Sequence, residues 1–157
     1  MIYNLKEKIL NLNVIYYFIL IFFIQLIPSI ILMVFNVENT NTSVNIIEQF
    51  NNIIITFLFV VVWGPIFETV IFQFILINLI KTFTQNTKYT MFLSIVIPSI
   101  VFGSSHPYNI YYFAFGTIIG LVYSSTYYIS QFFRKENGFI IVLLLHSSNN
   151  LLAFLTN

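Results

Sequence analysis

Apolar residues gather into five long runs that are separated by shorter polar segments. These runs cover residues 14–35, 52–80, 91–105, 110–130 and 139–156. A helix needs about 20 predominantly apolar residues to cross a hydrocarbon core of roughly 30 Å, and each run reaches or approaches that length. The pattern therefore predicts an all-α polytopic membrane protein with about five transmembrane helices.

Two of the runs carry helix-breaking signals. The second contains Gly64-Pro65, which predicts a tilt or kink because proline removes a backbone hydrogen bond. The third ends in "FGSSHP", where Pro107 should terminate the helix. The first run is too long for a signal-peptide core and lacks a small-residue cleavage site, so we expect a retained helix. We expect residues 1–51 to form an N-terminal helix with an external loop, and residues 52–157 to form a helical core.

The positions of the basic residues predict an orientation, because cytoplasmic loops carry an excess of Lys and Arg. With five crossings all six basic residues fall on one side, whereas dividing 52–80 at Pro65 into two crossings would scatter them. The loop at 36–51 holds Glu38 and Glu48 and no basic residue. We therefore expect a cytoplasmic N-terminus and an external C-terminus. The six basic residues are Lys6, Lys8, Lys81, Lys88, Arg134 and Lys135.

Composition supports a multi-pass protein of the cell membrane. The chain is 59% hydrophobic and 7% charged, and its mean hydropathy is +0.91. In soluble domains about a quarter of the residues are charged. The net charge is +1, and the six basic residues form no patch large enough to bind nucleic acid. The absence of cysteine excludes disulfides, thiolate zinc sites and cysteine nucleophiles.

Four polar residues stand out inside the apolar runs: Glu68, His106, His146 and Asn150. An ionisable group within a membrane is costly and usually marks a functional site. Counted from the cytoplasmic ends at 1.5 Å per residue, they lie about 10 to 22 Å deep. They could therefore meet near the midplane, and His146 and Asn150 share one helix face.

These side chains suit two kinds of hydrolytic chemistry. In the first, a carboxylate acts as general base on a water, an imidazole holds that water, and an imidazole and an amide stabilise an oxyanion, with no cofactor required. In the second, Glu68, His106 and His146 form an open three-ligand zinc site. The residues alone leave both alternatives open.

Structural explanations also exist for several of these residues. Glu68 could be a protonated carboxyl that hydrogen-bonds between helices, and Asn150 could link two helices in the same way. Gly116 and Gly120 have the GxxxG spacing that lets another helix approach closely. We interpret this pair as a packing face.

Three short motifs make the chain resemble the CAAX prenyl endopeptidase and bacteriocin-processing (CPBP, or Abi) family of intramembrane proteases. "GPIFETVIFQ" partly matches the family motif EExxxR through Glu68, "FGSSH" matches FxxxH through Phe102 and His106, and "HSSNN" matches HxxxN. The likeness extends over residues 60–154 and keeps the family's motif order.

The resemblance implies a role for each matched residue. Glu68 would be the general base, His106 its partner on the attacking water, and His146 with Asn150 the oxyanion donors. The family's second Glu and its Arg are replaced here by Thr69 and Gln73. Because these two are four residues apart, we expect a neutral hydrogen-bonded pair in place of the ion pair.

Three functions follow as hypotheses. The first is an intramembrane endopeptidase that acts on a peptide or membrane-protein substrate through a glutamate-activated water, with or without a metal. The second is a non-catalytic bacteriocin-immunity or regulatory membrane protein on the same fold, which the substitutions at Thr69 and Gln73 favour. A proton-coupled carrier is a weaker third, since five spans provide no inverted repeat.

Overall fold

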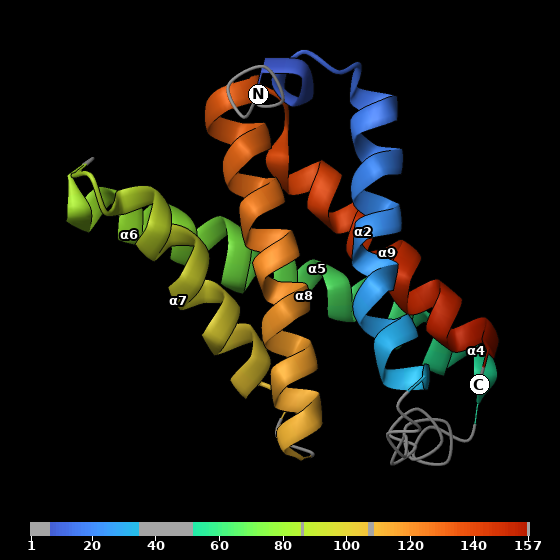
Figure 1. Ribbon diagram of the computed structural model, residues 1–157. Coiled ribbons are helices and arrows are strands. Elements are labelled where there is room, and N and C mark those ends of the chain that lie inside the picture. Colours follow the sequence, from blue (N-terminus) through green and yellow to red (C-terminus); the bar gives the residue numbers. More distant parts are fainter. Residues whose placement is uncertain (1–6, 35–51, 86, 107–108, 157) are drawn as a thin grey trace.

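The five apolar runs form helices that pack into a bundle (Figure 1). The structure is a computed structural model that describes residues 7–34, 52–85, 87–106 and 109–156. The helices are α2 (Val14–Val34), a long composite helix (Ile53–Thr84), α7 (Thr90–Ser104), α8 (Ile110–Tyr128) with its continuation η3 (Ile129–Arg134), and α9 (Gly138–Thr156). Every predicted run is a helix, and the break predicted near Pro107 falls between α7 and α8.

The long helix alternates between α-helical and π-helical segments. Its parts are α4 (Ile53–Phe57), η1 (Leu58–Trp63), α5 (Gly64–Glu68), η2 (Thr69–Ile75) and α6 (Leu76–Thr84). The predicted irregularity at Gly64-Pro65 takes the form of a π-helical segment, in which the Gly64 N–H donates to the Phe59 carbonyl. The helix therefore continues through Pro65. The wider π-helical turn accommodates a residue that has no backbone N–H to donate.

Helix α8 lies at the centre of the bundle and contacts α2, α7, α9 and η2 (Figure 1). Its inward face carries aromatic side chains such as Tyr123 and Tyr127, which are almost fully buried. These side chains join Phe72 of the long helix, Phe102 of α7 and Leu145 of α9 in one hydrophobic core. The central position of α8 places one helix in reach of every other part of the core.

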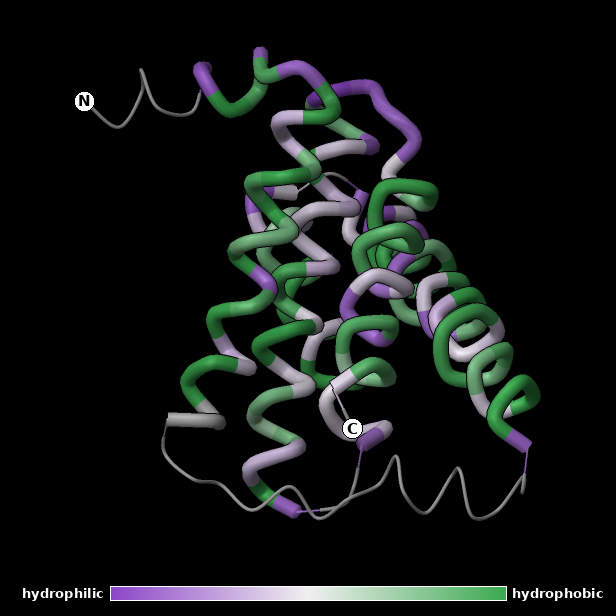
Figure 2. The backbone as a smooth tube through the Cα atoms, turned by 90° about the vertical axis from the view of Figure 1, so that its right-hand side faces the viewer, coloured by the Kyte–Doolittle hydropathy of each residue, from purple (hydrophilic) through white to green (hydrophobic). Residues whose placement is uncertain are grey.

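The outer faces of the bundle are strongly apolar, as a lipid-facing surface should be. Phe23, Phe67 and Phe92 are each at least 60% exposed, and hydrophobic residues line the helix shafts while hydrophilic residues concentrate at their ends (Figure 2). Within the described residues, Val14–Ile31, Ile53–Thr84 and Gly138–Thr156 are long and apolar enough to cross a membrane, and Thr90–Ser104 is a shorter apolar helix. The chain is therefore an all-α polytopic membrane protein.

The described basic residues lie toward one end of the bundle. The segment before α2, the turn after α6 and the connection between η3 and α9 lie toward the upper end in Figure 1, and the other helix ends lie toward the lower end. Lys6 and the loop at 36–51 fall outside the described residues. Five crossings with a cytoplasmic N-terminus stay a prediction, with which this arrangement agrees.

Arg134 ties the segment before α2 to the end of η3. Its guanidinium donates to the carbonyl oxygens of Ile9, Leu10 and Leu12 and to both carboxylate oxygens of Glu136. It also lies 4.2 Å from the Tyr17 ring centroid. The Arg134 side chain is only 2% exposed, so its charge depends entirely on these partners.

We expect Arg134→Leu to lower the free energy of unfolding by about 2–4 kcal/mol, because it leaves a partly buried carboxylate and several carbonyls without a donor. The neighbouring Lys135 is exposed, so Lys135→Gln is the matched control and should change stability little. The measurement is unfolding of both variants in the same detergent. Equal stability of the two variants would contradict the role of Arg134 as an anchor.

Candidate active site

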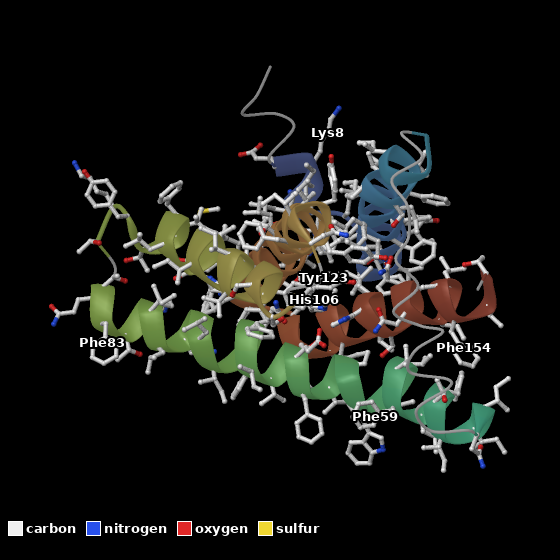
Figure 3. The ribbon with its side chains drawn as sticks, turned by 90° about the horizontal axis from the view of Figure 1, so that it is seen from below. Lys8, Phe59, Phe83, His106, Tyr123 and Phe154 are labelled. Atoms are coloured by element: carbon white, nitrogen blue, oxygen red, sulfur yellow. The ribbon has the colours of Figure 1, made fainter. Side chains whose placement is uncertain are left out.

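Helix α9 packs antiparallel to the long helix, and this pairing positions the site. Starting from the C-terminal end of α9, the Phe154 ring lies 5.5 Å from that of Phe57. Further back, Asn150 Nδ2 donates to the Val60 carbonyl over 2.9 Å, and the Phe139 ring lies 6.2 Å from that of Phe74. Figure 3 shows the two helices side by side along this seam.

Glu68 and His146 face each other within that seam. The distance from Glu68 Oε2 to His146 Nε2 is 3.5 Å, longer than the roughly 2.7–2.9 Å of a formed charge-assisted hydrogen bond. Neither Glu68 Oε2 nor His146 Nδ1 has a hydrogen-bond partner among the described residues. The Glu68 side chain is 31% exposed and that of His146 only 5%, so the carboxylate is the accessible member of the pair.

His106 approaches this pair from the C-terminal end of α7. Its Nδ1 lies 2.9 Å from the Phe102 carbonyl oxygen and 3.1 Å from Ser105 Oγ. Because a carbonyl only accepts, Nδ1 carries the proton, and Nε2 of the neutral ring is left as an acceptor. His106 interacts electrostatically with both Glu68 and His146, so three helices contribute to one polar site.

Aromatic rings form a wall behind the two histidines. The Phe102 ring lies 5.0 Å from that of His106 and 5.7 Å from that of His146, and the Tyr123 ring lies 4.9 Å from that of His146. Phe72 closes this wall at 5.4 Å from Phe102. These contacts fix the orientation of both imidazoles.

The two glycines of the GxxxG pair hold α7 and α8 close enough for this wall to form. A Cβ at Gly116 would lie 3.1 Å from Gly103 Cα and 3.7 Å from His106 Nδ1, and one at Gly120 would lie 2.9 Å from Ser99 Cα. Both distances to Cα are shorter than ordinary van der Waals contacts. The predicted packing face is confirmed, and it lies directly behind His106.

Asn150 lies one helical turn beyond His146 on the same helix. The amide that was expected to stabilise an oxyanion donates one hydrogen to the Val60 carbonyl, which belongs to the π-helical segment η1. The structure therefore brings Glu68, His106 and His146 together and places the Asn150 amide against the neighbouring backbone. One hydrogen of this amide remains for another acceptor.

Thr69 and Gln73 are fully buried, but the hydrogen bond that was predicted between them is not formed. Thr69 Oγ1 and both Gln73 amide atoms have no partner among the described residues. Both lie in η2, a π-helical segment from Thr69 to Ile75, where the repeat is wider than in an α-helix and residues four apart no longer stack. The prediction of a hydrogen-bonded pair was wrong for this reason.

The alternative zinc set does not fit the observed geometry. Within the described ranges, no group of three or more His, Asp or Glu side chains lies close enough to hold a metal ion. Glu68, His106 and His146 thus do not converge as ligands.

Tyr123 is part of this site and was not among the candidates from the sequence. Its ring contacts His146, and it is fully buried. Gly116, Gly120, Tyr123 and Tyr127 recur at intervals of four, three and four residues, which is the spacing of one helix face. That spacing after the GxxxG pair is the signal that could have identified it.

We expect Gly116→Leu to lower the free energy of unfolding by about 1–3 kcal/mol, because the new side chain forces α7 and α8 apart. Ala114 lies on the exposed side of the same helix, so Ala114→Leu adds similar volume without such a clash. Unfolding of both variants in detergent is the measurement. Similar losses from the two substitutions would contradict the close packing of α7 on α8.

Comparison with known proteins agrees with the resemblance inferred from the motifs. The family model described as type II CAAX prenyl endopeptidase, Rce1-like, matches residues 50–152. No curated protein and no solved structure gives a significant match. The matched range contains Glu68, His106, His146 and Asn150. The chain therefore belongs to the type II CAAX prenyl endopeptidase Rce1-like family, a family of membrane-embedded proteases.

Proposed function

We propose that this chain is an intramembrane endopeptidase of the cell membrane that hydrolyses a peptide bond of a peptide or membrane-associated substrate. The observation that carries the proposal is the 3.5 Å approach of Glu68 Oε2 and His146 Nε2. The pair is too far apart for a strong direct hydrogen bond, so each atom remains available to a third group. Membership of a protease family supports hydrolysis as the reaction.

In this proposal Glu68 is the general base. Its carboxylate takes a proton from a water, and the oxygen of that water forms a bond to the scissile carbonyl carbon while the carbonyl oxygen becomes an oxyanion. His106 Nε2 accepts a hydrogen bond from the other O–H of the same water and so orients the water. Because the Glu68 side chain is partly exposed, water and substrate can reach the carboxylate.

His146 stabilises the oxyanion, and Asn150 assists it with its remaining amide hydrogen. A donor fixed in a low-dielectric site stabilises a developing charge strongly, because it need not reorganise during the reaction. When the intermediate collapses, the carbonyl re-forms, the carbon–nitrogen bond breaks, and the leaving nitrogen takes the proton from Glu68. The wall formed by Phe72, Phe102 and Tyr123 holds the His146 ring in its orientation.

A second candidate, a non-catalytic immunity or regulatory protein, is favoured by one observation. Thr69 and Gln73 stand where the family motif has Glu and Arg, and their buried polar atoms have no partner among the described residues. In that case the fold would bind a partner without cleaving it. Its effect in cells would then persist when Glu68 is replaced.

The deciding experiment compares peptide termini in the membrane and secreted fractions of cells that express wild type, Glu68→Gln or Glu7→Gln at matched levels. Glu68→Gln keeps the shape of the side chain and removes the base, so termini produced by the protein should fall at least about 100-fold. Glu7 is exposed and outside the site, and Glu7→Gln should match wild type. Identical termini in all three strains, with the cellular phenotype retained, would exclude the protease and support the second candidate.

A further inference from the structure

Tyr123 places a phenol hydroxyl inside the site, where the described residues offer it no hydrogen-bond partner. The residue is fully buried at the centre of the bundle, and Figure 3 shows it beside His106. Its ring lies 4.9 Å from the His146 ring at a 36° tilt and 6.0 Å from the Phe102 ring. Its hydroxyl has no hydrogen-bond partner among the described residues.

A buried hydroxyl without a partner is unfavourable, because its lost hydration is not replaced. The next tyrosine on the same helix shows the ordinary solution. Tyr127 is equally buried, and its hydroxyl accepts a hydrogen bond from Asn78 Nδ2 over 2.9 Å. Tyr123 therefore differs from Tyr127 in one property: among the described residues, its hydroxyl has no hydrogen-bond partner.

The unpaired groups around Tyr123 belong to the same site. Glu68 Oε2 is buried and has no hydrogen-bond partner in the described part of the chain, and it lies 3.5 Å from His146 Nε2. The Tyr123 hydroxyl interacts electrostatically with the same carboxylate. A buried water typically makes about three hydrogen bonds to groups that are otherwise unsatisfied. A hydroxyl, a carboxylate oxygen and an imidazole nitrogen provide those three.

We propose that Tyr123 is a positioning residue of this site, and that its hydroxyl donates to a buried water that also bonds to Glu68 Oε2 and His146 Nε2. The effect of Tyr123 on catalysis rests on the proposed function, whereas its position relative to His146 can be tested without it. The water would hold Oε2 in place and leave the other carboxylate oxygen for the water that attacks the substrate. It would accept the His146 Nε2 hydrogen in the resting site, and the oxyanion would replace it as the acceptor during the reaction. Tyr123 would thus act through Glu68, without touching the substrate.

The test that needs no substrate uses the histidines as probes. The chain has only two, so protein labelled with ¹⁵N-histidine in nanodiscs gives four ring-nitrogen signals, which the His106→Asn variant assigns. Tyr123→Phe keeps the aromatic ring and removes only the hydroxyl, and it should shift the His146 Nε2 signal. Tyr127→Phe makes the same change one turn away and should leave that signal unchanged.

The same two variants have distinct expected effects on cleavage. Tyr123→Phe should lower kcat about 10- to 100-fold, the loss expected for one hydrogen bond to a charged group, with KM unchanged. Tyr127→Phe should keep the wild-type kcat. If wild type cleaves nothing, the proposed function fails, and the nitrogen signals still decide the position of Tyr123. A His146 signal that is the same in both variants, or an unchanged kcat in an active protein, would overturn the proposal.

Discussion

The antiparallel packing of α9 on the long helix is the constraint on which the rest of the structure depends. Contacts between aromatic rings fix the seam toward both ends, at Phe57 with Phe154 and at Phe74 with Phe139. Between them, the only carboxylate in the apolar runs lies opposite a buried imidazole. A shift of one helical turn, about 5.4 Å, would separate these groups and leave each one buried without the other.

The remaining helices serve this seam in different ways. Helix α7 supplies His106, and the glycines of α8 allow the close approach that puts Phe102 and Tyr123 against the histidines. The π-helical segments of the long helix lie on either side of Glu68. Such segments occur often at functional sites, because they change which side chains and carbonyls face inward. The Val60 carbonyl, which binds Asn150, belongs to one of them.

The helices could be predicted from the sequence, because apolar run length is a local property. Glu68, His106, His146 and Asn150 could be singled out as candidates, because the cost of a polar group within the membrane is local too. The partner of Asn150 could not, since a backbone carbonyl has no signature in the sequence. The pairing of Thr69 with Gln73 was predicted wrongly because α-helical spacing does not hold in a π-helical segment. Tyr123 was missed because one tyrosine among ten stands out only when its spacing from the GxxxG pair is considered.

The measurement that tests the seam most directly is cross-linking of introduced cysteine pairs in native membranes, since the chain contains no cysteine of its own. Phe57→Cys paired with Phe154→Cys, and Phe74→Cys paired with Phe139→Cys, should cross-link readily with a short bifunctional maleimide, because these rings are in contact and the reagent spans the gap that the shorter cysteine side chains leave. The exchanged pairs, 57 with 139 and 74 with 154, should not cross-link. Cross-linking of the exchanged pairs in preference to the matched ones would contradict the antiparallel register and the site built on it.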